Sequence, residues 1–195
     1  WAVINGDTET GVTTFFLKHD IDTGDIIDRR SIPINPEDNV GDIHDRLMML
    51  GAELTIDTVQ RILDGNLTTT PQDELTKGVE PTPAPKIFKE TCHIDWTRNA
   101  RDIHNLVRGL SPYPAAWCEL VSPDNDIKTI KIFTTAVTDD NASAEPGTIK
   151  SDNHRMLIAC GDKWLEVLSL QLSGKRRMDT AEFLRGFNPA AYKAQ

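Results

Sequence analysis

The spacing of apolar residues predicts one long helix in the first third of the chain. Between residues 39 and 64, apolar side chains recur at the interval that places them on one face of an α-helix. Gly65 follows the last of them and suits the end of a helix, where a left-handed residue is common. Asn39 or Asp42 suits the beginning, because both side chains accept hydrogen bonds from the free amides of a first turn.

Two shorter runs before this helix predict strands. Residues 12–17 (VTTFFL) are rich in β-branched and aromatic side chains. Residues 29–34 (RRSIPI) form a second extended run, in which Pro33 suits a strand near the edge of a sheet. The polar segment 19–27, HDIDTGDII, connects the two runs. Together with the helix, they predict an α/β arrangement.

Residues 66–90 lack any such periodicity. They contain four prolines and several threonines, a composition typical of an extended interdomain linker. The pattern therefore predicts a first domain over residues 1–65, a linker over 66–90 and a second domain over 91–195.

The second domain is predicted to begin with a short helix. Ile103, Leu106 and Leu110 lie on one helical stripe, with Thr97 as the expected N-cap and Gly109 as the expected end. Alternating runs follow, separated by turn residues, and predict the strands 116–121, 127–137, 147–150, 156–160 and 164–172. Short strands at this spacing favour a small barrel or sandwich.

A last short helix is predicted near the end of the chain. Asp179 and Glu182 are three positions apart, as in a capping box, and Gly186 is the expected end of the helix.

Composition narrows the class of protein. The chain has 195 residues with 38% hydrophobic content, enough for a globular core. No run approaches the roughly 18 apolar residues of a membrane helix and no signal peptide is recognisable, so the expected location is the cytoplasm. Three widely spaced cysteines predict buried free thiols and neither a disulfide framework nor a zinc site. The start at Trp1, on a pattern typical of a domain interior, indicates a fragment.

The net charge of -9 is unevenly distributed. Residues 1–90 hold 17 of the 30 acidic residues and 8 of the 21 basic ones. The remainder is electrically neutral, and a neutral module that gathers its basic residues on one face can still bind nucleic acid.

The segment HDIDTGDII has three interpretations on its residues alone. A metal loop is one, but the aspartates do not follow the spacing of the twelve-residue calcium loop. An acid/base site is another. Composition favours the third, a polar turn, because Asp and Gly dominate turns.

The flanks of this segment add a resemblance. Residues 11–27, GVTTFFLKHDIDTGDII, resemble the active-site signature of formyltransferases that use 10-formyltetrahydrofolate, with Gly11, Asp22 and Gly24 at its key positions. The resemblance implies a Rossmann-like catalytic domain that acts without a metal. It assigns Asp22 a catalytic role, orienting a histidine and a water that relays protons, and assigns Ile21, Thr23 and Gly24 to folate binding. Asp20, Asp25 and Asp28 are expected to be solvated turn carboxylates or caps, because Asp is common in such turns.

The second domain narrows the resemblance. Segments 94–96, 103–117, 146–149 and 168–186 resemble the C-terminal domain of the methionyl-tRNA formyltransferase family. That family implies an OB-like β-barrel, a monomer, and formyl transfer to the methionyl amine of initiator tRNA. Its catalytic Asn and His precede the position of Trp1, so the chain alone is expected to be inactive. A sugar-nucleotide formyltransferase and a non-catalytic nucleic-acid-binding remnant are the alternatives.

Basic residues of the second domain are candidates for tRNA binding. The segment SGKRRM forms a basic turn of a kind that contacts phosphates, although three surface charges are usually just solvated. The full set of candidates is Arg108, Lys128, Lys131, Lys150, Lys175, Arg176 and Arg177. Trp96, Trp117 and Trp164 could stack bases, but aromatic residues at these spacings more often pack, so we assign them to the core or to a domain interface.

Overall fold

The computed structural model describes residues 1–78 and 80–195, and it divides into two compact units. Val79, within the predicted linker, lies outside the described residues. The hairpin unit comprises Asp7–Pro36 and Asp42–Pro85, and the barrel unit comprises Trp1–Gly6, Glu37–Gly41 and Lys86–Gln195.

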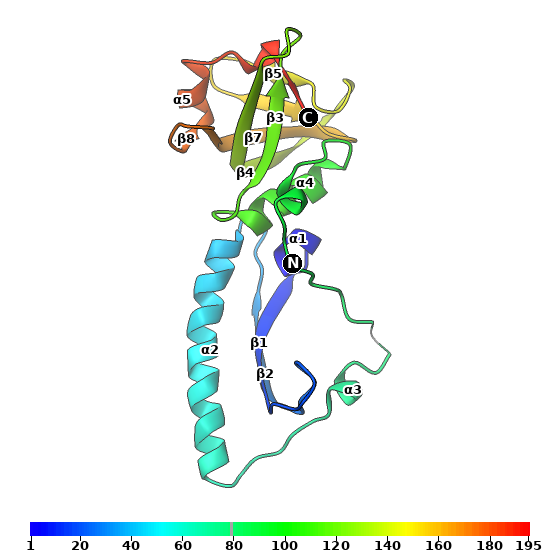
Figure 1. The fold of residues 1–195 in the computed structure, drawn as a ribbon, viewed down its shortest axis with the longest axis vertical. Helices are drawn as coiled ribbons and strands as arrows, with labels where there is room; N and C mark the ends of the chain where they lie inside the picture. The colour runs from blue at the N-terminus through cyan, green and yellow to red at the C-terminus, as the bar shows by residue number, and fades with distance from the viewer. Residues whose placement is uncertain (79) are drawn as a thin grey trace. The chain divides into compact units, whose positions relative to one another are not determined.

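The hairpin unit consists of two antiparallel strands and the long helix. Strands β1 (Glu9–Phe15) and β2 (Ile26–Pro33) pair along their length, and helix α2 (Val40–Leu63) runs beside them (Figure 1). Both strands and the helix were predicted at these places, within three residues at each end. The side chains of Leu54 and Ile43 on α2 are buried.

Both ends of α2 follow the sequence prediction. Asn39 Oδ1 accepts a hydrogen bond from the Gly41 amide at 2.7 Å. At the other end, Gly65 is left-handed, with φ +65°, and its amide donates to the Ile62 carbonyl while the Asn66 amide donates to the Arg61 carbonyl. This pair of bonds satisfies carbonyls that would otherwise lack partners at the helix end.

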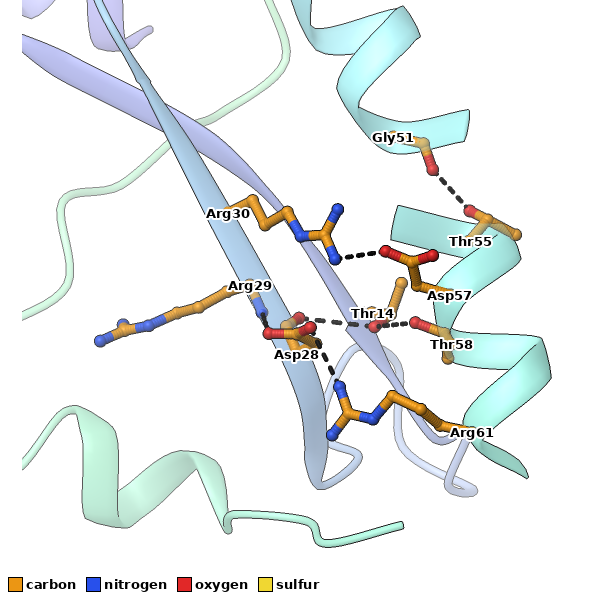
Figure 2. A network of polar contacts seen from close by, with 9 residues as sticks. All are labelled: Thr14, Asp28, Arg29, Arg30, Gly51, Thr55, Asp57, Thr58 and Arg61. Carbon is orange, nitrogen blue, oxygen red and sulfur yellow. Dashed lines mark hydrogen bonds and ion pairs between the residues drawn. The ribbon is translucent and has the colours of Figure 1, made fainter. Parts of the chain in front are cut away.

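Polar contacts join α2 to the hairpin (Figure 2). Arg61 of α2 contacts Asp28 of β2 at 3.0 Å, and Thr14 Oγ1 of β1 lies 3.0 Å from Thr58 Oγ1. Arg30 of β2 also pairs with a carboxylate of the helix. The expectation that Asp28 is a solvated turn carboxylate is therefore wrong. It is a strand residue whose side chain is paired with the helix.

The predicted linker contains regular structure close to the hairpin. The backbones of Ile26 and Thr70 exchange hydrogen bonds of 2.8 and 2.9 Å, and the short helix α3 (Gln72–Leu75) follows. Residues 66–90 are thus not uniformly extended, because the first part of the segment pairs with the start of β2.

The barrel unit is built on one antiparallel sheet with short helices packed against it. Its strands are β3 (Ala116–Val121), β4 (Ile127–Asn141), β5 (Ile149–Ser151), β6 (Met156–Ala159), β7 (Lys163–Leu172), β8 (Met178–Asp179) and β9 (Lys193–Ala194). The helical segments are α1 (Ala2–Asn5), η1 (Glu90–Cys92), α4 (Ala100–Leu110), α5 (Thr180–Leu184) and η2 (Pro189–Ala191). The strand order is β5-β6-β7-β4-β3-β9, and β8 pairs with β7.

An isolated bridge between Thr148 and Lys193 brings the two ends of this sheet together. Gly147 makes the closure: its amide donates to the Ala159 carbonyl, and its own carbonyl accepts from the Ala194 amide, both at 2.9 Å. The result is a nearly closed, barrel-like sheet around a core that includes Ile130 and Leu165, both fully buried. Of the two predicted architectures, a small barrel and a sandwich, the barrel is confirmed.

Helix α4 differs from its prediction at both ends. Its N-cap is Asn99, not Thr97, because Asn99 Oδ1 accepts from the Asp102 amide at 2.8 Å. Gly109 does not end the helix but lies inside it. A methyl group at position 109 would come within 2.4 Å of the Ile4 side chain, so the glycine permits the close approach of α1.

Helix α5 begins after Asp179 but lacks the predicted capping box. The Asp179 side chain makes no capping hydrogen bond, and Glu182 pairs instead with Arg176. The helix ends at Leu184, two residues before the predicted Gly186.

The three cysteines are free and buried, as expected. Burial raises the pKa of both the Cys118 and the Cys160 thiol to about 12. These thiols therefore remain protonated at neutral pH and act as small core side chains.

Candidate active-site loop and basic surface

The loop between β1 and β2 is closed tightly at its base. The Phe16 amide donates to the Asp25 carbonyl at 3.0 Å. Gly24 is buried beside this bond, and a methyl group at position 24 would lie only 1.4 Å from the Phe16 carbonyl oxygen. The glycine is therefore required by the crossing of the two loop arms.

Asp22 lies at the exposed end of the loop in a left-handed conformation, with φ +58°. Asp tolerates this region better than most residues, but the conformation still needs support from its surroundings. Within the described part of the chain, the Asp22 carboxylate has no hydrogen-bond or ion-pair partner. It is thus available to a ligand or a neighbouring group.

The residues beside Asp22 make contacts of their own. Asp25 pairs with Lys18 at 2.7 Å, and the backbone carbonyl of Asp20 accepts from Thr23 Oγ1 at 3.0 Å. Ile21 is 88% exposed beside them. Of the four predicted site residues, Gly24 is buried and the other three are exposed on one short turn.

The structure adds one residue to this loop that the sequence did not indicate. Gln72 Nε2 donates to the Asp22 carbonyl at 2.7 Å and to the Gly24 carbonyl at 2.8 Å. Gln72 lies some fifty positions away, at the start of α3. A side-chain contact to distant backbone leaves no local pattern in a sequence, so only the preceding Pro71, typical of a helix start, hinted at order here.

Three predicted tRNA-binding residues lie on the outer face of the β4–β7 pair. Lys131 stands opposite Gln171 in the strand register, and Gln171 Nε2 donates to the Lys175 carbonyl at 2.7 Å. Arg177 donates from Nε to Ser169 Oγ at 2.9 Å, two positions from Gln171 on the same side of β7. Lys131, Lys175 and Arg177, hereafter the basic face, therefore lie along the same face of the sheet.

The other exposed basic candidates pair with a carboxylate or lie over an aromatic ring. Lys128 leaves β4 three positions before Lys131, hence from the other side, and pairs with a carboxylate at 2.6 Å. Lys150 lies 3.9 Å from the centre of the Trp164 ring, and Arg176 is paired with Glu182.

Arg108 differs from all of these because it is only 9% exposed. Its guanidinium donates to Asn105 Oδ1 at 2.9 Å and to the Asp38 carbonyl at 3.0 Å. Burial lowers the pKa of Arg108, and the nearby Arg101 lowers it further. Its contacts are those of a residue that holds α4 to the segment around residue 38.

The tryptophans pack as predicted. Trp96 and Trp164 are 4% and 7% exposed, and Trp117 is half-buried against the barrel core. Their rings are therefore occupied by packing within the barrel unit.

The described residues contain neither a candidate metal site nor a candidate membrane-spanning helix. No group of three or more His, Cys, Asp or Glu side chains is arranged there to hold a metal ion. Nor does any helix in residues 1–78 or 80–195 have the length and apolar character needed to cross a membrane.

Comparison with known families gives two matches in chain order. Residues 1–59 match the model described as formyl transferase, and residues 86–188 match the model described as formyl transferase, C-terminal domain. The methionyl-tRNA formyltransferase of Bacteroides fragilis is 52% identical over 189 residues, which are 96% of this chain and 58% of that protein. The chain thus spans less than two thirds of the length of this relative.

Two solved structures resemble the fold at low sequence identity. The N-formyltransferase from Helicobacter canadensis, in complex with folinic acid and dTDP-3-aminofucose, is 19% identical with a TM-score of 0.60, over 91% of this chain and 59% of that one. HypX from Aquifex aeolicus, in complex with tetrahydrofolic acid, is 18% identical with a TM-score of 0.63, over 94% of this chain and 31% of that one. With the C-terminal model alone covering more than half of its 195 residues, the chain belongs to the formyl transferase family.

Proposed function

We propose that the complete protein carrying this sequence transfers a formyl group from 10-formyltetrahydrofolate to the methionyl amine of initiator Met-tRNA. The observation that carries this proposal is the 52% identity, over 96% of the chain, to a protein named methionyl-tRNA formyltransferase. A tRNA substrate places the reaction in the cytoplasm at the start of translation. The enzyme would act as a monomer, without a metal.

The reaction needs no nucleophile from the protein. The neutral methionyl amine attacks the formyl carbon, a tetrahedral oxyanion forms, and the bond from carbon to N10 of the folate breaks. One proton leaves the amine and one is gained by N10, so the step consumes no net proton. What the protein must supply is stabilisation of the oxyanion and a route for the proton.

Asp22 is the residue of this chain that we assign to the proton route. Its carboxylate is exposed and without a partner in the described part of the chain, as a group that must meet a histidine and a water requires. By family resemblance, a histidine and an asparagine of the complete protein would stabilise the oxyanion. An ionised Asp22 would fix the imidazole and favour its charged form.

The folate would be held beside this loop. Ile21 and Thr23 flank Asp22 on the exposed turn, and a pterin ring carries a donor and acceptor edge that backbone groups can match. Gly24 contributes differently, because its buried position lets the Phe16 carbonyl approach and so shapes the turn. Solved structures of similar fold contain folinic acid and tetrahydrofolic acid, which supports a folate-type donor.

The tRNA would contact the basic face of the barrel unit. Lys131, Lys175 and Arg177 share one outer surface, and charges of this kind bind phosphates without regard to sequence. Lys128 and Arg176 are secondary candidates because each is paired with a carboxylate, and Lys150 is one because it lies over the Trp164 ring. Arg108 is left out of the proposed surface because it is buried.

At the level of domains, we propose the C-terminal part of a Rossmann-like catalytic domain over residues 1–65 and an OB-like barrel over 91–195, joined by residues 66–90. The family matches to residues 1–59 and 86–188 support this division. Two segments of residues 1–65, Trp1–Gly6 and Glu37–Gly41, nevertheless belong to the barrel unit.

A formylation assay tests the proposal. The complete protein should convert initiator Met-tRNA to its formylated form with 10-formyltetrahydrofolate, and should leave amino sugars linked to nucleotides unmodified. Formylation of the sugar alone would favour the sugar-nucleotide alternative, and binding of tRNA without any transfer would favour the non-catalytic one.

A further inference from the structure

Gln72 holds the backbone on both sides of the proposed catalytic turn. Its amide nitrogen lies 2.7 Å from the Asp22 carbonyl oxygen and 2.8 Å from that of Gly24. A glutamine amide has two N–H donors, so one side chain satisfies both carbonyls at once. We propose that Gln72 is a positioning residue, which sets the conformation of the turn and thereby the direction of the Asp22 carboxylate.

The turn has few other restraints near its exposed end. The Phe16–Asp25 bond closes its base, and Thr23 Oγ1 donates to the Asp20 carbonyl. Neither bond reaches the carbonyls of Asp22 and Gly24. A left-handed residue such as Asp22 persists only where its surroundings hold it, and the Gln72 amide supplies that support.

Gln72 itself is fixed by regular structure. The two hydrogen bonds between Thr70 and Ile26 attach the chain to β2 just before it. The Gln72 carbonyl accepts from the Thr76 amide at 3.0 Å and from Thr76 Oγ1 at 3.2 Å. The donor is therefore held from both sides, so the segment after α2 is not a passive connection but the clamp of the turn.

The consequence rests on the proposed function of Asp22. A carboxylate that relays protons must lie within hydrogen-bond reach of its partners, and a displacement of about 1 Å can lower the rate by about a hundredfold. Gln72 acts only through the backbone of the turn. Its loss should therefore lower turnover without removing any group that binds tRNA.

The variant Gln72→Glu tests this at constant size. The carboxylate has no N–H donor and faces two carbonyl oxygens, so both hydrogen bonds are lost and repulsion is added. Gln60→Glu is the matched control, because Gln60 Nε2 donates to the side chain of Asp64 on the outside of α2 at 2.8 Å. In the complete protein, kcat of Q72E should fall roughly ten- to a hundredfold while Q60E stays near the wild-type value.

A double-mutant cycle separates positioning from general damage. If Gln72 acts through Asp22, then adding Q72E to Asp22→Asn should change the residual kcat less than about twofold. A purely structural role would lower kcat by the same factor in both backgrounds and overturn the proposal. Equal kcat for Q72E, Q60E and wild type would overturn it as well.

Hydrogen exchange gives a readout that does not depend on activity. Amides of residues 16–27 should exchange faster in Q72E than in Q60E, with no change in the barrel unit. Should Q72E fail to fold, Gln72→Met removes the donors without adding charge and serves in the same measurements. An inactive wild type with faster exchange in Q72E would reject the proposed function but keep the clamp, whereas unchanged exchange would reject the clamp itself.

Discussion

The aspartates around the β1–β2 loop are chemically identical but differ in their contacts. Asp25 is paired with Lys18, and Asp28 with Arg61. Asp22, left-handed and exposed, has no such partner among the described residues. A partner holds a carboxylate in place and engages its lone pairs, so Asp22, unlike Asp25 and Asp28, is free to serve a reacting group.

Substitution should therefore separate Asp22 from Asp28 in activity and in stability. In the complete protein, Asp22→Asn should lower formyl transfer by at least about a hundredfold, because the amide cannot stabilise a charged imidazole. Asp28→Asn should leave transfer nearly unchanged and weaken the fold by about 0.2–1 kcal/mol, the range for exposed ion pairs. Steady-state rates and denaturation curves check both, and similar activities for the two variants would contradict the assignment.

Gly147 presents a second residue whose local geometry permits a sharp test. Its φ of +84° strains any other residue, and a methyl group there would lie 2.1 Å from the Ala194 carbonyl oxygen. Gly147→Ala should thus destabilise the barrel unit by about 2 kcal/mol or more. Gly174→Ala is the control, because Gly174 has φ +76° but open space around it, and its cost should be about 1 kcal/mol.

Tryptophan fluorescence during urea unfolding can measure both glycine variants, because all four tryptophans belong to the barrel unit. An equal loss of stability in Gly147→Ala and Gly174→Ala would show that the strain of a positive φ alone causes the destabilisation. The contact of residue 147 with β9 would then contribute nothing to closure of the barrel.

Among the elements, α4 shows how closely two capping residues can compete. Thr97 and Asn99 both precede the apolar stripe, and both residue types cap helices. Asn99→Ala should destabilise the protein by about 1 kcal/mol, the usual effect of removing a cap. Thr97→Ala should lose only a few tenths of a kcal/mol, as at an ordinary surface position. Denaturation curves that placed the larger loss at Thr97 would contradict the observed N-cap.

The small loss of stability expected for Thr97→Ala should also depend on pH. Hydrogen bonds from the Thr97 hydroxyl and amide lower the pKa of Asp95 in the folded state. The unfolded state then binds more protons in the acidic range, so the stabilisation is present above the ordinary pKa of about 3.9 and is lost as pH falls through the folded value. Curves of stability against pH for wild type and Thr97→Ala should converge at low pH and separate above it.

Elements with strong local signals were predictable from the sequence. The apolar spacing and Gly65 located α2 to within one residue, and alternation located β3 at the residues observed. The start of α4 was missed by two residues because a second capping residue was available. Gly109 was misjudged, since a glycine that permits close packing of helices looks the same in sequence as one that ends a helix.

Of the candidate site, only the residues of the polar turn between β1 and β2 were predictable from the sequence. The resemblance singled out Asp22 and Gly24, and the structure adds the physical reason for a glycine at position 24. Gln72 and Thr70 were not predictable, because their partners lie in a segment far away along the chain. Hydrogen bonds from side chain to distant backbone depend on the folded path of the chain and leave no period in the sequence.

For the molecule as a whole, the uneven charge sets where a polyanion can bind. The net charge of -9 arises within residues 1–90, while residues 91–195 are balanced. Within this balanced part, Lys131, Lys175 and Arg177 gather on one outer surface of the sheet. A phosphate backbone is therefore expected on that surface and not on the acidic hairpin unit.

This expectation leads to a test by charge-matched variants. Lys131→Ala with Lys175→Ala removes two charges from the basic face, and Lys128→Ala with Lys150→Ala removes two charges elsewhere. In filter binding of tRNA by the complete protein, the first pair should reduce the slope of log affinity against log salt by about two. The loss should be equal for initiator and elongator tRNA, because phosphates carry no base identity. The second pair should leave the slope nearly unchanged, and an equal reduction by both pairs would mean that net charge, and not the basic face, attracts the tRNA.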